Sequence, residues 1–357
     1  MSNDRRDFLK ALGVTAAAVA GTGCGVAAAE SGTTGGDAVA TSTADATVAT
    51  DESAIGLSSR ATAKYGLELD GSFAGWLQTT DGGNATADVV TEKLGPDGIA
   101  KKHLAGVKYE DITVNCGAGM SKAFFQWIQD TLSMKFERKD GAVIESDFSG
   151  RELRRMDFKH ALISELDLPA LDASSRAAAK MTLKFSPEFT KLNPGSNAAI
   201  KFDTNVTLKW RTSDFKLRID GLDEATSHAL KIESITIKQN IVENAVGETR
   251  DFANEPAGLD FGNVAVTVPD TRAQSFYDWS DDFIVQGNNG DDKERGGTLD
   301  YLDSRGRPLF TLTFSHLGVF KVAPVNSDAA FKYRTIKGEM YVERIQFGQS
   351  SNSSSSD

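Results

Sequence analysis

The stretch SKAFFQWIQD at residues 121–130 returns in altered form as AQSFYDWSDD at residues 273–282. Its apolar side chains recur at the spacing of one helix face. They are Phe124, Ile128 and Leu132 in the first copy, and Phe276, Trp279 and Phe283 in the second. The spacing predicts one short helix, written twice, that buries this face in a core. We expect Ser121 and Asp270 to be the N-caps, because their side-chain oxygens can accept from free backbone N–H groups.

The flanks of the two predicted helices repeat as well. The first strand pattern of each copy, KYGLELDG and DFKLRIDG, alternates apolar and polar residues and ends in Asp-Gly, which favours a turn. A second alternating strand precedes each helix, and a hairpin with one long strand and then a closing strand follow it. The matching segments are 64–71 and 214–221, 109–116 and 261–268, 139–169 and 296–324, and 179–189 and 336–347. Each copy therefore predicts a mostly antiparallel β unit with one helix.

A chain of 357 residues suits two domains better than one. We expect a mainly β protein with two tandem barrel or sandwich domains, each with one short flanking helix. The turn-rich stretch KLNPGSNA sets the boundary between domain 1, residues 61–195, and domain 2, residues 196–349. Residues 30–60 are rich in Ala, Thr, Ser and Gly and are expected to be a flexible linker, and residues 350–357 a disordered tail.

The first residues carry an export pattern. Arg5 and Arg6 are followed by Phe8-Leu9-Lys10 and a weakly apolar run rich in Ala and Gly. This resembles a twin-arginine signal, whose pathway carries proteins that are already folded. We expect a signal peptide over residues 1–29 with cleavage near Ala29, and lipidation at Cys24 is the alternative. The protein is then expected outside the cytoplasmic membrane or in the cell envelope.

The composition argues against several functions. A net charge of −11 repels phosphate backbones, so nucleic acid is not expected as the main partner. Cys24 and Cys116 make no disulfide framework, and alternation places Cys116 on the buried face of a strand as a small hydrophobe. The sequence holds no G-x-S-x-G, H-E-x-x-H, P-loop or C-x-x-C motif. We therefore expect no enzyme, no catalytic residue, no cofactor and no metal ligand.

Two features nevertheless invite a site interpretation. His160 and His316 hold the same place in the two copies, each two residues after a Phe, and could form a paired ligand or a pH switch. We favour hydrogen-bonded barrel histidines retained by duplication, because nothing else titratable recurs beside them in the sequence. The stretch GNNGDDKERGG at residues 287–297 lacks the ligand spacing of a calcium loop. It is interpreted as an enlarged solvated turn, with weak metal binding as the alternative.

The first copy resembles the tail tube family of contractile phages and related injection systems. The likeness covers most of residues 61–190, from YGLELDGSFAGWLQ through VKYEDITVNCGAGMSKAFFQWIQ to the long strand followed by LPALDASSRAAAKMTLKFSPE. The second copy is similar but lacks that last linker. The resemblance implies small β-barrels with a helix at the side, which join edge to edge into six-membered rings that stack into a hollow tube. A chain with two fused copies would fill two of six positions, so three chains would close a ring.

We expect the protein to be an exported structural subunit whose main partner is itself. Open edge strands of a barrel would pair with another chain. Long excursions at residues 71–108 and 221–262 carry Val89, Val90 and the apolar positions of 232–237, which would be costly if exposed and suit an interface. Other tube or cap components are further candidate partners.

Two alternatives remain at this point. One is a tail tube protein of a phage or contractile injection system, although such tubes assemble in the cytoplasm and need no leader. The export signal favours an extracellular or envelope filament instead. The other is a monomeric envelope binding protein with two β-domains, for which exposed loop aromatics would be expected, and Phe73 and Trp76 are the only candidates.

Overall fold

The computed structural model describes residues 64–93, 98–200, 210–244, 252–325 and 334–349. The expected signal peptide, linker and C-terminal tail lie outside these residues. The described elements are mostly strands with a few short helices, which confirms the mainly β prediction. Within this part of the chain, no helix combines the length and the apolar character that crossing a membrane would require.

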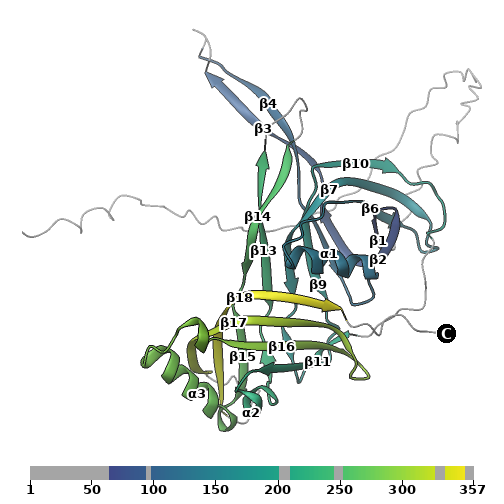
Figure 1. The fold of residues 1–357 in the computed structure, drawn as a ribbon. Helices are drawn as coiled ribbons and strands as arrows, with labels where there is room; N and C mark the ends of the chain where they lie inside the picture. The colour runs from purple at the N-terminus through teal and green to yellow at the C-terminus, as the bar shows by residue number, and fades with distance from the viewer. Residues whose placement is uncertain (1–63, 94–97, 201–209, 245–251, 326–333, 350–357) are drawn as a thin grey trace, which may run out of the picture. The chain divides into compact units, whose positions relative to one another are not determined.

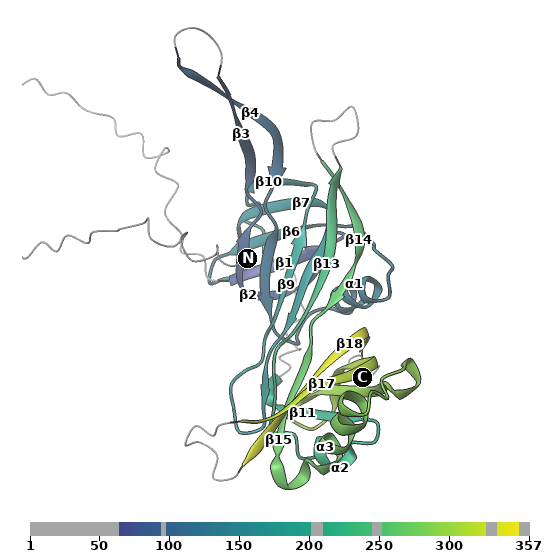
Figure 2. The same ribbon diagram turned by 90° about the vertical axis from the view of Figure 1, so that its left-hand side faces the viewer.

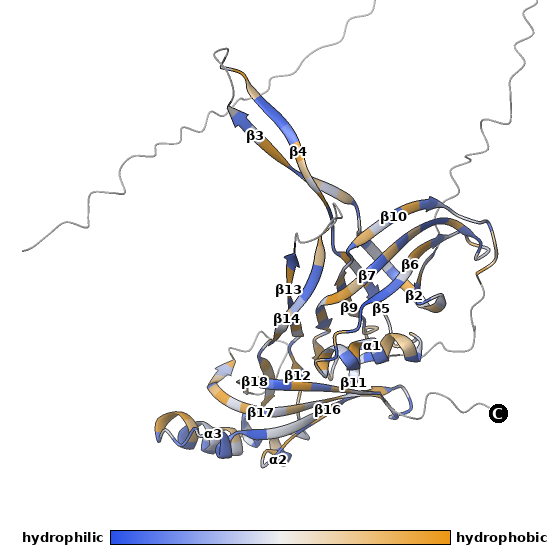
Figure 3. Cartoon of the chain, turned by 45° about the horizontal axis from the view of Figure 1, so that its top comes forward, coloured by the Kyte–Doolittle hydropathy of each residue, from blue (hydrophilic) through white to orange (hydrophobic). Residues whose placement is uncertain are grey.

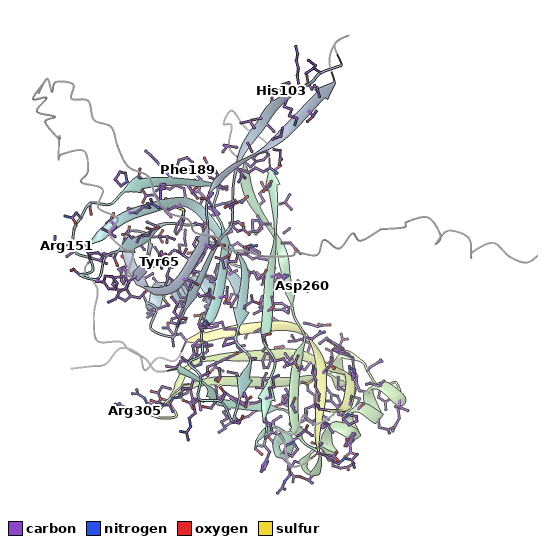
Figure 4. The ribbon with its side chains drawn as sticks, turned by 180° about the vertical axis from the view of Figure 1, so that it is seen from behind. Tyr65, His103, Arg151, Phe189, Asp260 and Arg305 are labelled. Carbon is purple, nitrogen blue, oxygen red and sulfur yellow. The ribbon has the colours of Figure 1, made fainter. Side chains whose placement is uncertain are left out.

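Six strands of the first copy close into a barrel, which Figure 4 views close to its axis at Tyr65. They are β1 (Lys64–Leu69), β2 (Ser72–Gly82), β5 (Ile112–Cys116), β6 (Lys139–Ser146), β7 (Glu152–Leu168) and β9 (Met181–Ser186). The antiparallel pairings run in a circle, β1–β2–β5–β9–β7–β6 and back to β1. Closure leaves the barrel wall without an edge, so the predicted open edge strands are wrong for this barrel. The free borders lie on strand ends that extend past the wall.

The second copy repeats this order without closing on itself (Figure 1). Its strands β11 (Trp210–Ile219), β16 (Arg295–Asp303), β17 (Pro308–Val325), β18 (Thr335–Gln349) and β15 (Val264–Pro269) pair in that order. They match β1, β6, β7, β9 and β5. Where β2 would stand, the chain has the single-turn helix α2 (Asp223–Thr226) and the short strand β12 (Lys231–Ile232). The second repeat therefore keeps the strand order of the first, but another part of the chain completes one wall of its barrel.

The repeated helix is present in both copies. Helix α1 (Lys122–Leu132) begins at the predicted cap, where Ser121 Oγ accepts from the Phe124 backbone N–H at 3.3 Å. The six predicted apolar side chains are all buried, which confirms the core face. The Asp270 prediction is wrong: a 3-10 turn (Asp270–Arg272) takes up the residues after the strand, so helix α3 (Gln274–Ser280) starts one turn later. Asp270 instead accepts from the Tyr277 hydroxyl at 2.9 Å.

The two excursions fold as hairpins with different surroundings (Figures 1 and 2). Strands β3 (Ala85–Lys93) and β4 (Ala100–Tyr109) pair only with each other among the described strands. Strands β13 (Ile235–Asn244) and β14 (Ala253–Phe261) join the sheet of the first copy. The prediction that the apolar residues at 232–237 form an interface with another chain is therefore wrong, because the protein itself buries Ile232, Ile235 and Ile237.

The stretch expected to hold the domain boundary is partly strand. β10 (Phe189–Pro194) pairs with β7, with Phe189 opposite Lys159 and Pro194 opposite Arg154. Together β9 and β10 take the place that the single long strand β18 takes in the second copy. The boundary at 195/196 stays a prediction, since strands of each copy enter the sheet of the other.

Candidate assembly interface

The first contact between the copies is strand pairing on an overhanging end. β7 is covered by β6 only as far as Ala161, and its last residues extend beyond that neighbour. β13 pairs there, with Ile235 opposite Leu168 and Lys238 opposite Glu165. A side-chain hydrogen bond from Thr236 to the Asp167 carboxylate adds to the ladder. The hairpin of one repeat thus extends the sheet of the other.

The second contact fills the open wall of the second barrel. The linker after β7 forms β8 (Leu171–Asp172), which pairs with β12, while Ala178 forms a bridge with Arg211 of β11. Two more backbone bonds hold it, from Ala173 N to Leu230 O at 2.9 Å and from Ala179 N to Trp210 O at 3.0 Å. The linker after β7, part of the segment that resembles the tail tube family, therefore completes the barrel wall of the second repeat.

The third contact is an aromatic stack between helix α1 and the second sheet. Phe125 is 5% exposed, and its ring lies 6.1 Å from that of Phe310 and 6.0 Å from that of Phe347. The last of these pairs is nearly parallel, at 10° between planes. Such stacks stabilise beyond the area they bury. Helix α1 is thus a docking element as well as part of its own repeat.

Two of these three contacts have an unused counterpart. From Gly318 to Val325, β17 pairs with β18 alone among the described strands, just where β7 accepts β13. Phe320 on this overhang is 42% exposed. Tyr277 of α3, the counterpart of Phe125, is 39% exposed where Phe125 is buried.

The β3–β4 hairpin is the counterpart of β13–β14, and it carries exposed apolar side chains among its charged ones. Val89, Val90 and Leu104 are all exposed, with Val89 at 58%. Figure 3 shows hydrophobic stretches along this hairpin, and Figure 4 places His103 near its far end. Its base is held by Lys108, whose Nζ lies 3.1 Å from Glu243. The hydrogen bond that Lys108 donates to the Glu243 carboxylate raises the pKa of Lys108 above its ordinary value.

The two predicted histidines occupy equivalent sites. Both take left-handed backbone conformations, with φ of 50° at His160 and 59° at His316. The strand register places Glu188 opposite His160 and Glu343 opposite His316. The prediction that nothing titratable recurs beside them is therefore wrong. Cross-strand register is invisible in the sequence, although both closing strands carry a Glu near the end of the matched segment.

The stretch at residues 287–297 is only partly the solvated turn that was predicted. Its 3-10 turn (Asp291–Lys293) is exposed, but the side chain of Glu294 is 5% exposed and faces His316. Cys116 is buried, and burial raises the pKa of its thiol to about 12, which confirms a core hydrophobe rather than a nucleophile. Phe73 and Trp76 are half-buried against each other at 5.1 Å, so they do not form an exposed binding surface.

Comparison with known families decides what the first repeat is. Residues 61–189 match the family model described as T4-like virus tail tube protein gp19. Residues 61–189 form a tail tube domain. This tail tube domain contains the whole closed barrel and helix α1, and the family is a structural one. Residues 2–22 match the twin-arginine translocation pathway signal sequence, so the chain carries a signal for export across the cytoplasmic membrane.

Several solved structures resemble part of the chain. The tube-terminating cap of the anti-feeding prophage and the sheath–tube complex of an extracellular contractile injection system are each 18% identical, cover 37% of this chain and 88% of their own, and give TM-scores of 0.33. Hcp1 from Flavobacterium johnsoniae is 19% identical, covers 37% of this chain and 97% of its own, and gives a TM-score of 0.24. A search of curated proteins returned no match.

Proposed function

We propose that the protein is an exported structural subunit that assembles with itself into rings stacked as a hollow tube or filament outside the cytoplasmic membrane. The observation that carries this is the contact between the two repeats, in which β13 extends the overhang of β7. The equivalent overhang of β17 and the equivalent β3–β4 hairpin have no such partner among the described residues. Repeating the internal contact between chains would join each free donor to a free acceptor.

A contact of this kind is head-to-tail. One chain offers its hairpin, the next offers its overhang, and the donor and acceptor surfaces differ, so the interface either closes as a ring or continues as a filament. Strand addition supplies backbone hydrogen bonds, and the exposed side chains of the hairpin supply apolar contact. Tyr277 would then be covered as Phe125 is. With two repeats per chain, three chains give six positions.

The place of assembly follows from the signal. A subunit exported in the folded state would meet its neighbours in the envelope or outside the cell, and lipidation at Cys24 would tether it there, whereas cleavage near Ala29 would release it. The match to the tail tube family supports a tail tube protein of a phage or contractile injection system as the second candidate. A monomeric binding protein is disfavoured because Phe73 and Trp76, the aromatic residues it would use, are half-buried against each other.

The test uses the chain from residue 61 onward, purified without its leader. We expect rings or tubes by negative-stain microscopy and a multimeric mass by light scattering. Phe320→Lys places a charge on the β17 overhang and should leave a folded protein that no longer assembles. Phe148→Lys is the matched control, because Phe148 is a more exposed phenylalanine at a hairpin turn. A wild-type monomer at high concentration would refute the proposal, as would equal assembly of both variants.

A further inference from the structure

Three potential metal ligands meet in the second repeat. Side-chain ligand atoms of Glu294, His316 and Glu343 lie within 4.8 Å of one another. His316 Nδ1 lies 2.7 Å from Glu294 Oε2, and the hydroxyl of Tyr341 donates to Glu294 Oε1 at 2.6 Å. Glu294 immediately precedes β16, and His316 and Glu343 lie in the middle of β17 and β18, so the sheet itself fixes their spacing.

The first repeat has a different set at the same positions. His160 Nδ1 lies 2.8 Å from Glu188 Oε2, and Arg138 Nε lies 3.4 Å from Glu188 Oε1. Lys139 pairs with Ala161 as Arg295 pairs with Leu317, so Arg138 and Glu294 occupy equivalent places. The two sets therefore differ by one change from arginine to glutamate. In the first repeat the arginine neutralises a carboxylate, whereas the second repeat has two carboxylates beside an imidazole.

The second set lacks the cation that balances the first. Within the part of the chain that the structure describes, neither Glu294 nor Glu343 forms an ion pair with a lysine or arginine. The Glu294 side chain is only 5% exposed. Two carboxylates held this close to each other, one of them removed from water, repel each other unless a proton or a metal cation lies between them.

We propose that Glu294, His316 and Glu343 bind one divalent transition-metal ion of the Zn²⁺ type. One imidazole nitrogen and two carboxylate oxygens are a ligand set that such ions accept, with water in the remaining position. The ion would replace the proton shared by Glu294 and His316, and that proton would pass to solvent. The Tyr341 hydroxyl would orient Glu294 from outside the ligand set. Mg²⁺ and Ca²⁺ would bind less well, because they prefer oxygen ligands alone.

The test is isothermal titration calorimetry on untagged, leader-free protein with Zn²⁺ and, separately, Ca²⁺. We expect one Zn²⁺ per chain, no comparable binding of Ca²⁺, and a higher melting temperature with Zn²⁺. Glu294→Arg rebuilds the set of the first repeat and should weaken Zn²⁺ binding at least tenfold, as should His316→Asn, since Asn tolerates the left-handed backbone. His160→Asn is the matched control and should bind Zn²⁺ as wild type does.

Two results would overturn the inference. One is wild-type protein that takes up no Zn²⁺, or a Glu294→Arg variant that binds it unchanged. The other is wild-type protein that binds no Zn²⁺ while Glu294→Arg loses assembly, because the carboxylates would then serve a contact between chains. Melting curves of each variant without metal show whether it is folded, so that a loss of binding is not mistaken for a loss of structure.

Discussion

At the scale of single residues, the duplication extends to the hydrogen bonds of its turns. DFSGR and DSRGR close the two long hairpins, with Gly150 at a φ of 74° and Gly306 at a φ of 76°. Asp147 Oδ1 accepts from the Arg151 backbone N–H at 2.9 Å, and Asp303 Oδ1 accepts from the Arg307 backbone N–H at 2.9 Å. Gly tolerates this left-handed backbone at little cost, and both turns place it at the same position.

One of these carboxylates predicts a pH dependence. Burial by itself would raise the pKa of Asp303, but hydrogen bonds from the Arg307 backbone and guanidinium outweigh it and hold the pKa below its ordinary value. A carboxylate with a lowered folded-state pKa adds stability above its unfolded pKa of about 3.9, and this is lost as the pH falls through the folded value. Asp303→Asn should lower the free energy of unfolding by about 1–2 kcal/mol at pH 7.

The measurement is the urea midpoint of wild type and variant from pH 7 down to pH 3. The gap between the two should narrow below about pH 4, because the wild-type carboxyl is then becoming neutral as well. Asp147→Asn is the control, since the Arg151 guanidinium donates to Asn197 O instead. A gap that stays constant with pH would show that the charge of Asp303 does not stabilise the fold.

At the scale of elements, the two helices share a buried face but not a cap. Ser121 caps α1, whereas Ala273 precedes α3 and offers no side-chain bond. We expect Ser121→Ala to lower the free energy of unfolding by about 1 kcal/mol. Asp270→Ala should cost less, because it removes only an exposed bond to Tyr277. Urea unfolding of both variants tests this, and an equal or larger loss in Asp270→Ala would contradict the assignment of caps.

Periodicity was enough to predict these elements, because alternation and helical spacing are local. Leu67, Val114 and Met181 are buried as their strand patterns indicate. The strand exchange could not be predicted in the same way. Whether β13 pairs with its own repeat or with β7 depends on register between segments far apart in the chain, and a local pattern says only that one face of β13 is apolar.

At the scale of the whole molecule, the described part of the chain contains one complete example of the contact we propose between chains. The two repeats resemble neighbours in a ring more than independent domains, because each supplies strands to the sheet of the other. Removing residues 221–262 would therefore remove buried core residues such as Ile235 and unfold the protein. Loss of the β3–β4 hairpin, by contrast, should prevent assembly without unfolding the protein.

Replacing residues 88–106 with Asn-Gly should shorten this hairpin without unfolding the protein. Ala87 lies opposite Val107, so a two-residue turn fits the register, and the base bonds between Asn84 and Glu110 remain. We expect the melting temperature to change little, because the removed strands pair only with each other. The shortened chain should form no rings or tubes by negative-stain microscopy, since its donor keeps the base of the hairpin at Ala85 but loses the exposed apolar side chains of Val89, Val90 and Leu104.

Mixing variants gives the sharpest form of this prediction. The shortened chain keeps the β17 overhang as acceptor, and Phe320→Lys keeps the β3–β4 hairpin as donor. Each alone should stay a monomer, and together they should form a one-to-one complex that grows no further, because the single intact contact uses the only complementary surfaces left. Light scattering of the equimolar mixture measures this. Polymers in the mixture, or no complex at all, would place the contact between chains on other surfaces than β3–β4 and β17.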